Sequence, residues 1–158
     1  MKSRIFVSIA LGACAIALAG CQKEPASEAA AEADIGIAAS NVKLVLPAVK
    51  GNPGAVYFDI VNNAREFAVL RKVEVAGAKE AMMHDTIDNN GVMEMVALQP
   101  VNLPKGETIK FERGGKHVMA MELDETLAAG GTTEVTFTFT GGDKLSVPAT
   151  IEAIGGAN

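Results

Sequence analysis

The sequence predicts an all-β domain, either an antiparallel β-sandwich or a Greek-key barrel of about 115 residues. From Val42 onward, short segments alternate apolar and polar side chains or form compact apolar runs. Turn residues separate these segments. No apolar repeat with a period of about 3.6 residues continues for the length of a helix. We therefore expect the core to be built from strands.

Residues 1–20 are predicted to be a lipoprotein signal peptide. Two basic residues precede an apolar run over residues 5–18, which is too short to span a bilayer comfortably. The run ends in Leu18-Ala19-Gly20-Cys21, which resembles the lipobox of bacterial lipoproteins, so we expect cleavage before Cys21 and acylation of this residue. Cleavage before Cys14 would leave too short an apolar core. An ordinary secretory signal with an incidental Cys21 is the alternative.

Residues 21–40 are rich in Ala and Glu and nearly lack large apolar side chains. Such a composition cannot bury a core and suits a tether. The folded domain is then expected to cover residues 41–158. Together, these segments predict a periplasmic protein held at a bacterial membrane by its lipid.

Charge and cysteine content exclude several classes of protein. The formal net charge is −5, and Arg71-Lys72 is the only basic doublet, so the sequence lacks the basic footprint of a nucleic-acid-binding protein. Both cysteines precede residue 22, which excludes a disulfide framework in the domain. An enzyme is disfavoured because, outside the methionine-rich segment described below, there is no histidine, thiol or recognisable serine motif.

The candidate strands follow one another along the chain. The clearest is Thr133 to Thr140, where Val135, Phe137 and Phe139 alternate with polar residues. A helical turn is possible in "LDETLAAG". In chain order, the expected strands are "VKLVLPAV", "AVYFDIVNN", "FAVLRKVEVA", "EAMMHDTID", "VMEMVAL", "TIKFERG", "KHVMAMEL", "TEVTFTFTG" and "KLSVPATIEAI".

Histidine and methionine are concentrated in one part of the chain. Both histidines and all methionines except the initiator fall between residues 82 and 121. In a strand, His117, Met119 and Met121 would share one face, because alternate residues point the same way. This clustering suggests a row of soft metal donors, with core packing as the alternative.

A hairpin is expected to bring His84 and Met95 together. Asp88-Asn89-Asn90-Gly91 is a strong hairpin signal. A two-residue loop at Asn89-Asn90 would set His84 directly opposite Met95, whereas a loop at Asn90-Gly91 would make them diagonal neighbours. Both registers place the two donors on one face.

A donor set of two imidazoles and two thioethers favours Cu(I). Thioether sulfur suits this soft ion, whereas Mg, Ca and Mn prefer oxygen and structural zinc usually recruits cysteine. A blue-copper electron-transfer centre needs a cysteine thiolate, which the domain lacks.

The spacing His-x10-Met-x21-His-x-Met, formed by His84, Met95, His117 and Met119, resembles the signature of the periplasmic PCuAC-type copper chaperones and implies that these four residues are the ligands. The segments "AVYFDIVNN", "NNGVMEM" and "LPKGETIKFERGGKHVM" resemble that family too. The resemblance implies a cupredoxin-like β-barrel that binds one Cu(I) and passes it to copper-requiring respiratory proteins. The implied acceptors are the copper site of cytochrome c oxidase or a thiol-bearing Sco-type protein.

Other readings of the same residues remain open. A copper buffer or resistance lipoprotein without a dedicated acceptor would use the same ligands, and an adhesive β-sandwich would use none. We interpret the remaining methionines mainly as core side chains, with Met121 also a candidate for an outer shell. Asp85 is a solvated strand residue or a partner that orients a ligand imidazole. The methionines interpreted in this way are Met82, Met83, Met93 and Met121.

Overall fold

The computed structural model describes residues 31–32 and 36–155. The predicted signal peptide, Cys21 and most of the predicted tether lie outside the described residues. Within the described part of the chain, no helix is long and apolar enough to cross a membrane.

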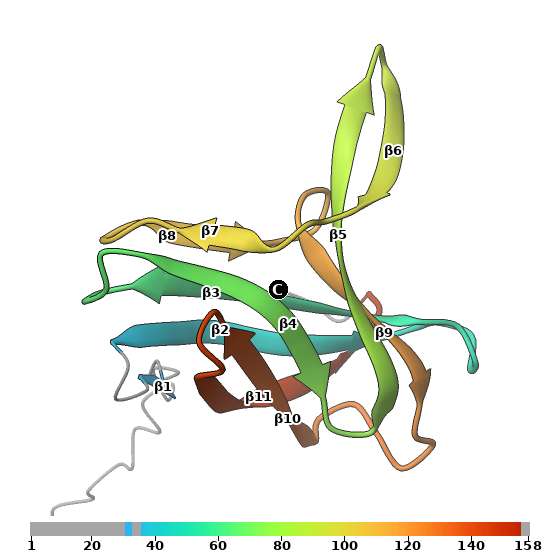
Figure 1. Cartoon of the computed structure of the whole chain (residues 1–158). Coiled ribbons are helices and arrows are strands. Elements are labelled where there is room, and N and C mark those ends of the chain that lie inside the picture. The colour runs from blue at the N-terminus through green and yellow to red at the C-terminus, as the bar shows by residue number, and fades with distance from the viewer. Residues whose placement is uncertain (1–30, 33–35, 156–158) are drawn as a thin grey trace, which may run out of the picture.

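All strands of the described chain belong to one sheet, which is shown in Figure 1. Its order is β6-β5-β9-β3-β2-β11-β10-β4-β7, with β1 added to β2 and β8 added to β3. The strand bounds are β1 Ala31–Glu32, β2 Ile37–Leu46, β3 Gly54–Asn62, β4 Ala68–Val75, β5 Ala78–Asn89, β6 Val92–Ala97, β7 Val101–Leu103, β8 Thr108–Phe111, β9 His117–Leu123, β10 Thr132–Phe139 and β11 Lys144–Ala153.

The core lies between the apolar faces of the central strands. Alternate residues of β3 and β10 are buried, as the period of two in their sequences requires. Phe58 of β3 stacks on Phe111 with ring centroids 4.2 Å apart and meets the edge of Phe137 at 4.7 Å. These aromatic contacts join β3, β8 and β10 into one packed interior.

The all-β prediction is confirmed, and most expected strands are present with small changes at their ends. β2 begins at Ile37, within the segment 21–40 that we predicted as a tether. Its first residues are small or aliphatic and fully packed, because Ile37, Ala38 and Ala39 are all buried. The alanine-rich composition therefore concealed the start of a core strand.

Three other features differ from the expectations. β2 and β11 pair in parallel, whereas we expected only antiparallel pairs. The three-residue strand β7 was not predicted, because a segment this short carries too little alternation. The segment "LDETLAAG" forms turns rather than a helix, with the amide of Leu127 donating to the carbonyl of Asp124 at 3.1 Å.

Strands β5 and β6 form a hairpin whose tip projects from the body of the molecule (Figure 1). Its two-residue loop is Asn90-Gly91, where both residues have positive φ, 55° and 84°, as a type I′ turn requires. The amide of Gly91 donates to Oδ1 of Asp88 at 2.6 Å. Of the two registers that the sequence allowed, the chain adopts the one that pairs Thr86 with Met95.

Candidate metal site

The two histidines lie directly opposite each other on neighbouring strands. β5 pairs antiparallel with β9, and the register sets His84 against His117 and Met82 against Met119. On β9, Val118 and Ala120 point into the core and are fully buried. His117, Met119 and Met121 alternate with these two residues and therefore occupy the opposite face of β9. Met82 and His84 of β5, which pair with Met119 and His117, lie on the same face. We call this the donor face.

The imidazole rings of the two histidines are close and nearly parallel. Their centroids are 6.0 Å apart, and the ring planes are inclined by 27°. Nδ1 of His117 lies 2.8 Å from the carbonyl oxygen of Gly115, and His117 is only 6% exposed. A carbonyl can only accept, so Nδ1 donates its hydrogen and Nε2 keeps a free lone pair. His117 is thus held in the tautomer that can bind a metal through Nε2.

Gly115 also connects the two strands beneath this pair. Its carbonyl accepts a second hydrogen bond, from the amide of Thr86 on β5, at 3.3 Å. One backbone oxygen therefore orients the ring of His117 and ties it to the strand of His84. Sequence patterns do not reveal this role of Gly115, because a backbone carbonyl leaves no mark on side-chain composition.

His84 has a buried polar atom without a partner. Its Nδ1 is one of two buried side-chain nitrogen or oxygen atoms in the described residues that make no hydrogen bond. Leaving such an atom unpaired costs about 1–3 kcal/mol. A bound cation beside the imidazole pair would relieve this cost, so the residues present fit a metal ion.

Met95 and Met119 flank the histidine pair from opposite ends. Met119 follows His117 by two residues along β9, on the same face. Met95 is 55% exposed on β6 and lies opposite Thr86, two residues beyond His84 in the other direction. The structure thus brings His84, His117 and Met119 together on paired strands and places Met95 diagonally on the hairpin.

The core interpretation is wrong for Met82 and Met93. Met82 is 41% exposed and Met93 is 61% exposed. Both lie on the donor face, Met82 opposite Met119 and Met93 opposite Asp88 near the hairpin tip. The hairpin leaves the body of the molecule, so alternation in this segment does not separate a buried face from an exposed one.

Of the other two methionines, Met83 follows the core interpretation, while the outer-shell role of Met121 stays a prediction. Met83 packs against the core, in agreement with its interpretation as a core side chain. Met121 lies on the donor face beside Met119 and opposite Glu80, and it is half-buried.

Asp85 forms an ion pair with the side chain of Lys116 rather than a hydrogen bond to an imidazole. Its Oδ2 lies 2.9 Å from Nζ of Lys116, and only 19% of the aspartate side chain is exposed. This ion pair joins the residue after His84 to the residue before His117. Asp85 therefore links β5 to β9 beside the histidines, while the oxygen that contacts His117 comes from Gly115.

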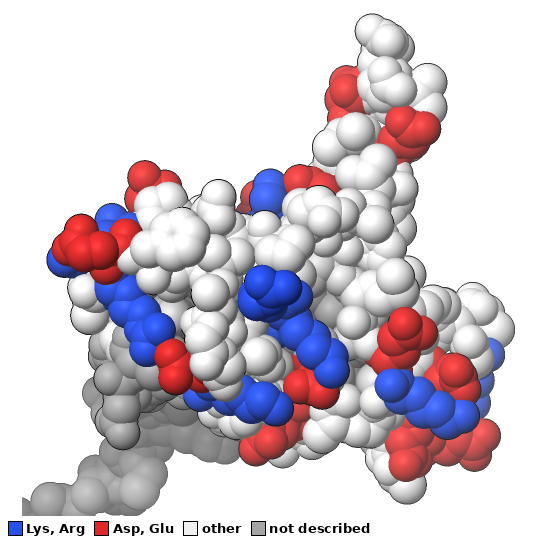
Figure 2. Space-filling view, in the orientation of Figure 1, with Lys and Arg blue, Asp and Glu red and all other residues white. Residues whose placement is uncertain are grey.

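Charge is distributed unevenly around the hairpin. Residues 80–104 contain Glu80, Asp85, Asp88 and Glu94 but no lysine or arginine. Figure 2 shows acidic side chains and no basic ones on the projecting part of the hairpin. Among the described residues, no three His, Cys, Asp or Glu side chains form a cluster that could hold a metal. The donor face supplies thioethers next to its two imidazoles.

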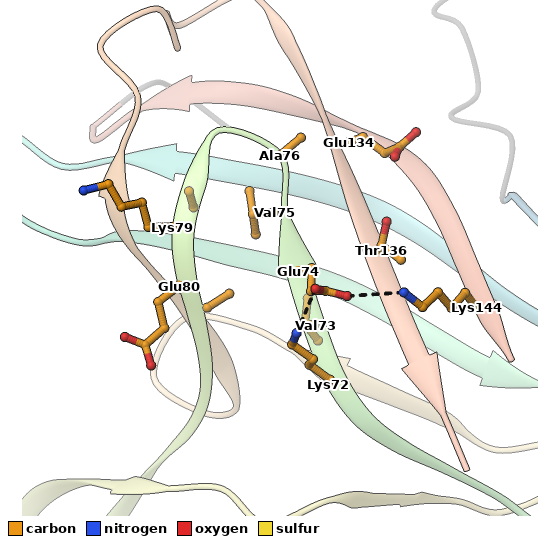
Figure 3. Close-up of a pocket in the computed structure, with 12 residues that line it drawn as sticks. Lys72, Val73, Glu74, Val75, Ala76, Lys79, Glu80, Glu134, Thr136 and Lys144 are labelled. Atoms are coloured by element: carbon orange, nitrogen blue, oxygen red, sulfur yellow. Dashed lines mark hydrogen bonds and ion pairs between the residues drawn. The ribbon is translucent and has the colours of Figure 1, made fainter. Parts of the chain in front are cut away.

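A groove of about 580 Å³ lies elsewhere, between β4, β5 and β10 (Figure 3). Its lining includes no histidine or methionine. Glu74 accepts a hydrogen bond from Lys72 at 2.7 Å and lies 3.7 Å from Lys144. The hydrogen bond and charge of Lys72 lower the pKa of Glu74, with a smaller contribution from Lys144. These charged groups neutralise one another, and the histidine pair remains the candidate site.

Comparison with known proteins places the chain in a family. The family described as "Putative lipoprotein LpqE-like" matches residues 37–151. The chain belongs to the LpqE-like family. It is 27% identical over 153 residues to "Putative lipoprotein Lxx21020" of Leifsonia xyli subsp. xyli, covering 96% of this chain and 88% of that protein.

Solved structures with the same fold include several PCuAC domains. The structure of CuI-DR1885 from Deinococcus radiodurans is 27% identical to this LpqE-like chain, with a TM-score of 0.55, over 84% of this chain and 85% of that one. The apo PCuAC domain from PmoF1 is 25% identical, with a TM-score of 0.62, over 77% and 98% of the two chains. The copper-bound PCuAC domain from PmoF2 is 21% identical with a TM-score of 0.60, over 75% and 93%, and supports the fold alone. The predicted resemblance to the PCuAC-type family and its cupredoxin-like fold is confirmed.

Proposed function

We propose that this protein is a copper chaperone that binds one Cu(I) outside the cytoplasm through His84, Met95, His117 and Met119. The site carries metal as cargo and performs no reaction on it. Acylated Cys21 would hold the domain at the membrane, and the residues between Cys21 and β1 would give it reach.

The observation that carries this proposal is the opposed histidine pair. His117 presents Nε2 because its Nδ1 donates to Gly115, while Nδ1 of His84 is buried and unpaired. Thioethers stand next to both rings on the same face. Two neutral imidazoles with thioethers form a donor set suited to Cu(I), and no charged ligand opposes release of the ion.

The relatives support the same cargo. DR1885, at 27% identity, has a solved structure with Cu(I). Family membership also favours a metal carrier over an enzyme or an adhesive lipoprotein.

The ligand assignment can be tested by competition with a chromophoric Cu(I) chelator. All proteins would be full-length and carry Cys14→Ser and Cys21→Ser, because a free thiolate would compete for Cu(I). We expect one Cu(I) per chain. His84→Ala and His117→Ala should weaken binding most, Met95→Leu and Met119→Leu less, and Met121→Leu least. Wild-type affinity in all four ligand variants would overturn the assignment.

We further propose that the chaperone delivers copper to a respiratory acceptor, either the copper site of cytochrome c oxidase or a Sco-type protein. A copper buffer or resistance lipoprotein is the competing function, because the same exposed ligands would serve it. Oxidase activity and copper tolerance should be measured side by side in a deletion strain. Loss of oxidase at low copper supports delivery, whereas copper sensitivity with normal oxidase supports buffering.

The lipid anchor has its own test. Mass spectrometry of the mature protein should find an N-terminus at Cys21 carrying acyl chains. An unmodified N-terminus, or one that starts elsewhere, would contradict anchoring without affecting the copper site.

A further inference from the structure

We propose that Met82 is an additional copper donor, able to take the place of Met95 in the coordination of Cu(I). This inference rests on the proposed function and names a residue outside the four-residue signature. Met82 stands next to His84 on β5 as Met119 stands next to His117 on β9.

In the register of β5 and β9, the Cβ atoms of Met82, His84, His117 and Met119 lie at the corners of a rectangle. His84 and His117 form one cross-strand pair, and Met82 and Met119 form the next. Directly opposed Cβ atoms are about 5 Å apart, and the two pairs are separated by about 6.6 Å along the strands. All four side chains leave the same face of two paired strands, which places them as neighbours around one position above the sheet.

Met82 does not belong to the hydrophobic core. It is 41% exposed, while its neighbours Ala81 and Met83 pack against the core from the other face of β5. Burial in the core therefore does not account for this thioether, which lies opposite a second thioether and beside two imidazoles. The chemistry that this arrangement supports is binding of a soft cation.

Met82 and Met95 differ in how firmly their positions are fixed. Met82 lies where β5 is paired with β9, which is itself paired with β3 in the body of the sheet. Met95 lies on the outermost strand of the projecting hairpin (Figure 1). When Met95 dissociates from the metal, Met82 takes its place and keeps Cu(I) four-coordinate until an acceptor ligand arrives. The ion then passes to the acceptor by exchange of single ligands.

The test uses the thiol-free full-length chain and methionine-to-leucine substitutions, which preserve volume. The variants are Met82→Leu, Met95→Leu and the double variant, titrated with Cu(I) against a chromophoric chelator. Each single variant should weaken binding by at most about tenfold, and the double variant should weaken it about tenfold beyond the product of the singles. X-ray absorption should show that each single variant keeps the sulfur count of the wild type and that the double variant loses one sulfur.

Met93→Leu is the matched control. Met93 is an exposed methionine on the same face, but it lies opposite Asp88, about 13 Å along the strand from His84. Combined with Met95→Leu, it should add no loss. A double Met82–Met95 variant that binds Cu(I) as Met95→Leu does would overturn the role of Met82. Absence of Cu(I) binding by the wild type, or wild-type binding by His84→Ala and His117→Ala, would instead overturn the proposed function.

Discussion

The body of the sheet and the β5–β6 hairpin use apolar side chains for opposite purposes. In the body, Phe58 and Phe137 are fully buried and touch each other. In the hairpin, Ile87, Val92 and Met93 are exposed on a two-stranded ribbon that leaves the body. Burial explains the first group but not the second.

Within one sheet, the buried side chains of the body therefore serve stability, and the exposed side chains of the hairpin are available for function. Side chains of the body contribute to folding by leaving water, at about 25 cal/mol per Å² of buried apolar surface. The thioethers of the hairpin remain in water, where a partner protein or a metal ion can reach them. Exposed methionines are therefore better evidence for a functional surface here than buried ones.

The largest effect should come from the body. Phe137→Ala removes a ring that packs against Phe58 and should lower the free energy of unfolding by about 3–5 kcal/mol. Met93→Ala, at an exposed site, should change it by less than about 0.5 kcal/mol. Urea denaturation of both variants compares the two regions directly. Equal losses would show that the hairpin is part of the cooperative core.

A shortened hairpin should have a smaller effect. Deleting residues 88–89 and 92–93 keeps Asn90-Gly91 as the loop and joins it to Ile87 and Glu94, which already pair. Because the deleted residues lie outside the core, we expect the free energy of unfolding to change by less than about 1 kcal/mol. Thermal unfolding and Cu(I) titration of the shortened chain test this. A chain that fails to fold would give the tip a structural role.

The smallest effect should come from Glu74 in the groove of Figure 3. Lys72 lowers the pKa of Glu74 below its ordinary value of 4.5, so the ion pair stabilises the fold above that pH and is lost as pH falls through the lowered value. The glutamate is exposed to solvent, which screens the pair. Glu74→Gln should hardly change Tm at pH 7, and any difference should vanish in acid. A difference that grew in acid would contradict this sign.

Local patterns in the sequence predicted the elements, but not all the pairings between them. The Asn90-Gly91 loop was foreseeable because type I′ turns need residues that tolerate positive φ. The pairing of His84 with His117 was not, because more than thirty residues separate them and no short turn sets the register between β5 and β9. The same gap concealed the position of Met82 opposite Met119.

The methionine interpretations failed for a related physical reason. Alternation identifies a buried face only where the other side of the sheet is covered. Met83 points into the body and follows this rule, whereas Met93 sits on a ribbon exposed on both sides. The four residues of the signature do lie on one face, and their role as ligands stays a prediction. Gly115, which orients His117, acts through a backbone atom that sequence patterns do not show.

Strand β6 also exposes the protein to self-association. It is the outermost strand of the sheet, nearly all of its residues are exposed, and Glu94 carries its only charge. An edge of this kind can add a strand from a second molecule, and short apolar segments without proline favour amyloid-like stacking. Two copies that paired antiparallel about Glu94 would bring two carboxylates together. Glu94 thus acts as a gatekeeper against aggregation, on an edge that must stay uncovered for its sulfur atoms to be reached.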